Sequence, residues 1–183
     1  MVFRSADECK RRAAELGIPR ISPDSPLLLT DEVTFIRFSI EDALNARFAL
    51  ARLFVSWFGE FRDCEFWISE YGIWPSFEDR NLYRRLRRTH GDFRELHEAP
   101  AHLFEFGEKA DLETYLGIAM IFGWGGHILP DPLRVYIFLS NDGWLHVAAR
   151  EGIGKIMSDL DKYEIEYEEY DAESQSQGNR GPA

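Results

Sequence analysis

The sequence predicts a single α+β domain, with helices packed on a mixed or antiparallel sheet of about four to five strands and a C-terminal hairpin. Three observations support this class. Apolar residues recur at helical spacing in residues 39–59 and 153–160, and they alternate with polar residues in 64–69. Two apolar runs, 133–139 and 144–149, flank the turn sequence Ser-Asn-Asp-Gly. Helices and strands follow one another without a regular βαβ rhythm, which favours α+β over α/β.

The N-terminal part, residues 1–26, is predicted to form a helix and a connector. Ser5 and Glu8 stand three residues apart, as the two members of a capping box do, and Gly17 is a suitable C-terminal stop. A strand over residues 33–38 follows.

Two capped helices are predicted next. Ser39 caps the first, and Gly59 closes it. A strand over residues 64–69 separates it from the second, which begins at Ser76 and ends before Gly91. Both helices carry apolar residues at helical spacing, so each is expected to bury one face.

The second half of the chain is predicted to be mostly helical around one hairpin. Residues 92–107 are expected to be irregular with one short helical turn, and a helix over 109–122 ends at the glycine-rich segment 123–126. After the hairpin, a helix over 153–160 precedes a strand over about 163–168, in which tyrosine and isoleucine alternate with glutamate.

Composition sets the domain limits and the class of partner. Residues 27–170 are expected to form the globular domain and 171–183 a disordered acidic and polar tail. The net charge is −11, and residues 158–183 hold eight acidic against two basic residues. This charge makes nucleic acid an unlikely partner and favours a basic protein. No apolar run approaches membrane-spanning length, so no membrane association is expected.

The two cysteines, Cys9 and Cys64, lie far apart in no metal-binding pattern. A reduced, cytoplasmic protein is the simplest interpretation. Arginine predominates over lysine, which fits a GC-rich genome, and a bacterial origin is expected. The five histidines have no metal-type spacing, so neither a metal site nor a cofactor is predicted.

An arginine-rich helix is one candidate binding site. Four of its arginines would share one helix face and could bind an anion: Arg80, Arg84, Arg87 and Arg88. Leu82, Tyr83 and Leu86 would face the core. The commoner explanation for such a face is a solvated surface balanced by nearby acids, or one that docks the chain's own acidic tail.

A second candidate is a cleft lined by aromatic and histidine side chains. Its proposed members are Trp124, His127, Trp144 and His146, which flank the glycine-rich segment and the hairpin turn. The alternative is that both histidines belong to the core and are satisfied by backbone carbonyls.

The acidic C-terminal strand is a third candidate, as a protein interface. Its members are Glu164, Glu166, Tyr167, Glu168 and Tyr170. No catalytic motif is present, so the sequence favours a non-catalytic protein-binding module of the immunity, inhibitor or adaptor type. The alternatives are a small-molecule-binding protein or enzyme that uses the Trp/His cleft, and an anion or nucleic-acid binder that uses the arginine helix. The oligomeric state is not indicated.

Overall fold

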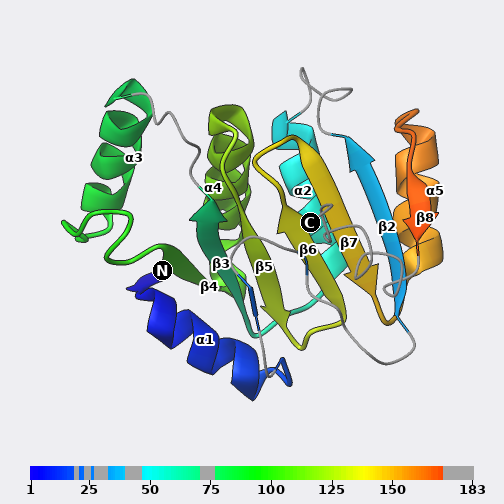
Figure 1. Ribbon diagram of the computed structural model, residues 1–183, viewed down its shortest axis with the longest axis horizontal. Helices are drawn as coiled ribbons and strands as arrows, with labels where there is room; N and C mark the ends of the chain where they lie inside the picture. The colour runs from blue at the N-terminus through cyan, green and yellow to red at the C-terminus, as the bar shows by residue number, and fades with distance from the viewer. Residues whose placement is uncertain (19–20, 23–25, 27–32, 40–46, 71–76, 171–183) are drawn as a thin grey trace, which may run out of the picture.

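A computed structural model describes residues 1–18, 21–22, 26, 33–39, 47–70 and 77–170, with only the backbone of 77–80. Within these residues the chain forms five α-helices and eight strands (Figure 1). The helices are α1 (Ala6–Glu15), α2 (Arg47–Phe58), α3 (Phe77–Thr89), α4 (Lys109–Phe122) and α5 (Ile153–Lys162). The strands are β1 (Val2–Arg4), β2 (Thr34–Ser39), β3 (Asp63–Glu70), β4 (Ala101–Glu105), β5 (Gly125–Asp131), β6 (Val135–Leu139), β7 (Trp144–Ala149) and β8 (Glu168–Tyr170).

All eight strands form one sheet in the order β1-β4-β3-β5-β6-β7-β2-β8. Every neighbouring pair is antiparallel. The α+β class is therefore confirmed, whereas the expected number of four to five strands is wrong. The prediction missed β1, β4 and β5.

The strand β5 was hidden by residues that strands usually avoid. It begins with Gly125 and Gly126 and contains Pro130 near its end. Gly126 lies so close to β3 that a Cβ atom would collide with the carbonyl oxygen of Trp67. Pro130 lies beyond the part of β5 that pairs with β6. The strand β5 thus tolerates Gly126 because the backbones of β3 and β5 approach closely, and it tolerates Pro130 because its pairing with β6 is short. In the sequence these residues resemble a loop.

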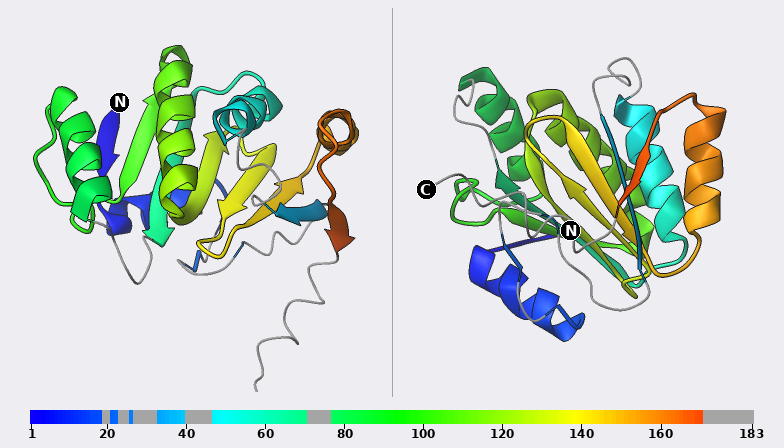
Figure 2. Two further views of the ribbon diagram at one scale, coloured as in Figure 1. Left: turned by 90° about the horizontal axis from the view of Figure 1, so that it is seen from above. Right: turned by 45° about the vertical axis from the view of Figure 1, so that its right-hand side comes forward.

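The two faces of the sheet are covered differently. Helices α2, α4 and α5 pack on one face, and α1 lies on the other (Figures 1 and 2). The larger core forms on the side of α2 and α4 and includes Phe66, Ile128 and Ile137. Alternate residues of the same strands, such as Trp67 and Phe138, belong to smaller clusters on the α1 side.

The N-terminal segment belongs to this sheet through β1, which pairs with β4. The predicted capping box at α1 is confirmed: the Ser5 amide donates to a Glu8 carboxylate oxygen at 2.7 Å, and the Glu8 amide donates to Ser5 Oγ. Cys9 is a fully buried residue of α1, and Arg12 Nη2 on the same helix lies 2.6 Å from Asp131 Oδ2. Polar contacts thus supplement the small apolar face of this helix.

Most other local predictions are confirmed. The hairpin joins β6 to β7, and helices α4 and α5 occupy the expected positions. The predicted starts of the two middle helices, residues 40–46 and Ser76, lie outside the described residues, as does the tail 171–183.

The position of the last strand is corrected by the structure. Glu164 has a φ angle of 56°, which no extended strand contains, and β8 begins only at Glu168. Ile165 and Tyr167 pack against the larger core in the connection that leads to β8.

None of the described helices has both the length and the apolar character needed to cross a membrane.

Candidate functional site

The most unusual polar group in the structure is Arg87 on α3, whose side chain is 1% exposed. The predicted arginine face would leave it in solvent with Arg84 and Arg88, so the structure corrects that expectation. Leu82, which was expected to face the core, is 54% exposed instead. Arg87 is buried because α3 packs against Phe3 at this position. The Arg87 guanidinium lies 4.6 Å from the centroid of the Phe3 ring on β1, an arrangement that favours a planar cation.

A carboxylate holds this guanidinium on one side. Asp92, which follows the end of α3, accepts a hydrogen bond from Arg87 Nη2 at 3.0 Å. Asp92 also accepts from Arg94 through the backbone amide at 2.8 Å and through Nη2 at 2.8 Å. Burial acts to raise the pKa of Asp92, but the hydrogen bonds from Arg94 and Arg87 outweigh it and lower the pKa to about 2. Asp92 is therefore a carboxylate at any physiological pH.

Two nitrogens of Arg87 remain without a partner. Nε and Nη1 are buried and donate a hydrogen bond to no acceptor within the described chain. Arg87 lines a cavity of about 80 Å³ together with Tyr83, Leu96 and Trp124. Arg84, Glu95 and His97 complete the described lining. A single water needs only about 10–15 Å³ of such space, so the cavity can hold a small ligand.

The end of α4 places Trp124 in this cavity. Gly123 has a left-handed conformation with a φ of 65°, and the Trp124 amide donates to the Ala119 carbonyl at 2.9 Å. This is a Schellman motif, which turns the chain sharply at the helix end. The Trp124 ring then meets Tyr83 edge to face, with ring centroids 5.0 Å apart. The glycine-rich segment thus stops the helix, as predicted, and also orients an aromatic wall.

A second polar pair lies behind the cavity wall. Tyr83 donates its hydroxyl to Nε2 of His102 on β4, and His102 Nδ1 lies 3.3 Å from the Phe66 carbonyl. Burial, aided by the charge of Arg87, lowers the pKa of His102 to about 3. Burial also raises the pKa of Tyr83 well above its ordinary value. Both groups are therefore neutral at pH 7, and the position of each is fixed by its partner.

The predicted Trp/His cleft does not form as a single unit. Trp124 packs on the side of the larger core, whereas His127 lies on the opposite face of the sheet against Trp67. His146 and Trp144 share that opposite face through the neighbouring strand β7, where Arg37 of β2 lies over the Trp144 ring. The structure therefore separates Trp124 from the other three residues.

The two histidines in that proposed cleft are engaged with tyrosines. His127 Nδ1 is 2.8 Å from the Tyr136 hydroxyl, and His146 Nδ1 is 3.0 Å from the Tyr170 hydroxyl. The ring of Phe138 lies between them, 4.9 Å from His127 and 6.1 Å from His146. Burial lowers the pKa of His146 to about 4. These contacts favour a structural role for both histidines.

Three other arginines of α3, Arg84, Arg85 and Arg88, are on the surface. Arg84 forms an ion pair with Glu95 at the rim of the cavity, and Arg88 lies 5.9 Å from the Phe93 ring centroid. The side chain of Arg80 lies outside the described residues. Of the four predicted anion ligands, Arg84 and Arg87 therefore line the same cavity.

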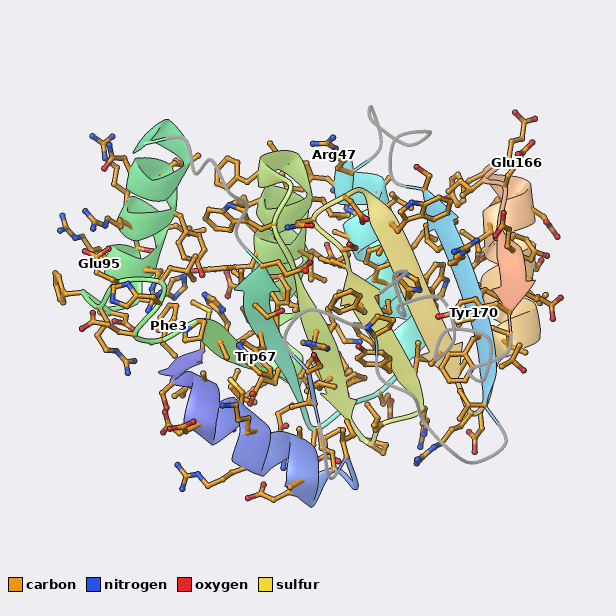
Figure 3. The ribbon with its side chains drawn as sticks, viewed as in Figure 1. Phe3, Arg47, Trp67, Glu95, Glu166 and Tyr170 are labelled. Carbon is orange, nitrogen blue, oxygen red and sulfur yellow. The ribbon has the colours of Figure 1, made fainter. Side chains whose placement is uncertain are left out.

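The acidic candidate interface lies at the other end of the sheet. Figure 3 shows Glu166 and Tyr170 beside α5 and β8, far from Phe3 and Glu95 near α3. Glu164 and Glu166 are exposed, whereas Glu168 forms an ion pair with Arg37 at 2.7 Å. Tyr167 and Tyr170 are partly buried.

Several residues in or beside the cavity are not indicated as site residues by the sequence. The sequence predicts Tyr83 as a core residue, and Asp92 is only one of the nearby acids expected to balance the arginines. The available signal was Gly91-Asp92 directly after an arginine-rich helix, because a residue there can turn back to the last helical turn. His97 and Leu96 carried no comparable signal.

No family model, curated protein or solved structure matched this chain. Within the described residues, no group of three or more histidine, cysteine, aspartate or glutamate side chains could hold a metal ion. The chemistry of the cavity beside Arg87 is thus the strongest basis for a function.

Proposed function

We propose that this chain is a binding protein for a small anion, which occupies the cavity beside Arg87. The observation that carries the proposal is the pair of unpartnered nitrogens, Nε and Nη1, on a side chain that is 1% exposed. Each buried donor without an acceptor costs about 1–3 kcal/mol of stability. The oxygens of an anion would accept from these donors and would also face a cation that keeps its charge in proteins.

Binding fits this cavity better than acid–base catalysis. A general acid or base works best when its pKa lies near the working pH. The pKa of His102 is about 3 and that of Tyr83 is raised, so neither exchanges a proton readily at pH 7. The Tyr83–His102 pair instead fixes the wall against which a ligand would rest.

The test compares two neighbouring arginines on the same helix. Arg87→Met removes the buried guanidinium, and Arg88→Met removes an exposed one as the matched control. Acetate, propionate, inorganic phosphate and sulfate are titrated into the full-length protein, and amide and indole NMR shifts are followed. We expect saturable shifts at Tyr83, Leu96 and Trp124 that vanish in Arg87→Met and persist in Arg88→Met.

A further variant guards against a folding defect in Arg87→Met. Leu96→Phe adds volume to the cavity wall and leaves all charges in place. It should weaken anion binding while circular dichroism and the unfolding midpoint stay close to those of the wild type. Equal binding of every anion by wild type, Arg87→Met and Leu96→Phe would refute the proposal.

We propose, as a second candidate, that the acidic end of the sheet binds a basic protein. The observation in its favour is that Glu164 and Glu166 are exposed beside β8, the outermost strand of the described sheet. Main-chain groups on an outer strand and nearby charges can recruit an extended basic segment.

Its test is charge reversal away from existing ion pairs. Glu164→Lys with Glu166→Lys should abolish capture of a basic partner, and Glu60→Lys with Glu151→Lys is the matched control, because both of these acids are also exposed. Glu168 is left unchanged because its ion pair with Arg37 helps to hold β8. Equal capture by both double variants would refute this candidate.

A further inference from the structure

The charges around the cavity restrict the kind of anion that fits. Beside the cavity, the carboxylate of Asp92 accepts hydrogen bonds from both Arg87 and Arg94. Separately, the carboxylate of Glu95 accepts from Arg84. Glu8 and Glu98 also act on the charge of Arg94, but the hydrogen-bonded group of Arg87, Asp92 and Arg94 by itself has a net charge of +1. A single negative charge would neutralise it, whereas a dianion would leave an excess negative charge in a poorly hydrated place.

The lining restricts the rest of the ligand. Leu96 is partly buried against the core, and the rings of Tyr83 and Trp124 meet edge to face at the cavity wall. Three of the lining side chains thus present apolar or aromatic surface, and Arg84, Arg87, Glu95 and His97 supply the polar part of the lining. A ligand that matches this arrangement has an anionic head and a small apolar body.

We propose that the ligand is a small monocarboxylate whose carboxylate binds Arg87 and whose apolar body rests against Trp124 and Leu96. This inference rests on the proposed anion-binding function and names the substrate class for the same cavity. A carboxylate has one charge and two coplanar acceptor oxygens, which fit the planar guanidinium. Unlike inorganic phosphate, a monocarboxylate also has an apolar body that can contact the apolar part of the lining.

Ligand pairs of equal shape separate charge from shape. Propionate and propionamide have nearly the same size, but only propionate is charged. Butyrate adds one methylene to the apolar body, and inorganic phosphate at pH 8 is mainly a dianion. Each probe is titrated alone into the full-length wild type, Arg87→Met and Arg88→Met, with the Trp124 indole signal as the NMR reporter.

We expect propionate and butyrate to bind at least tenfold more tightly than propionamide and more tightly than phosphate. Arg87→Met should weaken propionate binding at least tenfold, and Arg88→Met should leave it unchanged within twofold. In Trp124→Phe the indole is absent, so the backbone amide of Leu96 serves as the NMR reporter. In this variant butyrate should lose more affinity than acetate, because only butyrate reaches the apolar wall.

Other outcomes separate this inference from the function on which it rests. If phosphate binds more tightly than propionate and depends on Arg87, the cavity is an anion site but the monocarboxylate inference is wrong. If propionamide equals propionate, the charge plays no part and the inference is also wrong. If no probe shows binding that depends on Arg87, the proposed function fails together with the inference.

Discussion

Asp92 is predicted to be the residue that makes a buried Arg87 tolerable, and Asp92→Asn is the substitution that tests this. The asparagine keeps an oxygen that can accept the hydrogen bond from the Arg94 amide but removes the negative charge. Arg87 would then be a buried cation with no opposite charge in contact. Removing one partner of a buried ion pair typically destabilises a protein by about 3–5 kcal/mol, and we expect a loss of that size.

The pKa of Asp92 gives an independent magnitude. Its value falls from 3.8 to about 2 in the folded chain. At 1.36 kcal/mol for each pKa unit, the ionised form is favoured by about 2 kcal/mol on folding. Since the folded pKa is lowered, this stability is fully present above pH 4 and is lost as the pH falls toward 2. The difference between wild type and Asp92→Asn should therefore shrink over that same range.

A double-mutant cycle provides the assay. Free energies of unfolding are measured by urea titration at pH 7 for the wild type, Asp92→Asn, Arg87→Met and the double variant. We expect Asp92→Asn to destabilise the Arg87→Met background by only about 1 kcal/mol, because the exposed Arg94 is then the remaining partner. An equal loss in both backgrounds would show that Arg87 does not depend on Asp92.

Three further predictions concern other parts of the fold. Gly126→Ala should destabilise the protein by about 1–3 kcal/mol, because the added Cβ would meet the backbone of β3. Gly154→Ala in α5 places its Cβ in open space and should stabilise the protein by about 0.5–1 kcal/mol. Urea titration measures both free energies of unfolding, and equal effects would refute the packing argument. Cys9 and Cys64 are free and buried, and burial raises the pKa of both thiols, so neither should react with a thiol reagent until urea unfolds the chain; fast labelling of the native protein would contradict this. Burial also raises the pKa of Glu65, so the wild type should gain stability relative to Glu65→Gln as the pH falls from 7 toward 4.5, and a constant difference in unfolding free energy would be the contrary result.

The parts of the fold that the sequence predicts correctly are those with local signals. The capping box at Ser5, the turn before Gly143 and the spacing of apolar residues in α4 and α5 all act within a few residues. The missed strands β1, β4 and β5 depend on partners far away in the chain. For example, His102 of β4 pairs with Phe3 on one side and Phe66 on the other. No short stretch of the sequence contains all three strands, so a search for alternating polar and apolar residues could not detect their pairing.

The candidate site shows the same division. The sequence predicts the arginine-rich helix correctly, but it does not predict which of the helix's side chains face the core. On a helical wheel Arg87 falls close to Arg84 and Arg88. All three are assigned to the polar face because arginine is rarely buried. The structure buries it since Phe3 supplies a ring beneath the guanidinium and Asp92 supplies a carboxylate. Neither partner can be assigned from the periodicity of the helix itself.

The contrast between two of the buried charged residues, Arg87 and Glu65, strengthens the anion-binding proposal. Each has at least one buried polar atom without a partner within the described chain. Glu65 can lessen the cost of burial by taking up a proton, which is the direction in which burial moves its pKa. Arginine has no such route, because it keeps its proton throughout the pH range in which proteins fold. Asp92 divides its single negative charge between Arg87 and Arg94, so it offsets only part of the charge of the buried Arg87. Water in the cavity could satisfy the free donors but not this charge, and a bound anion satisfies both.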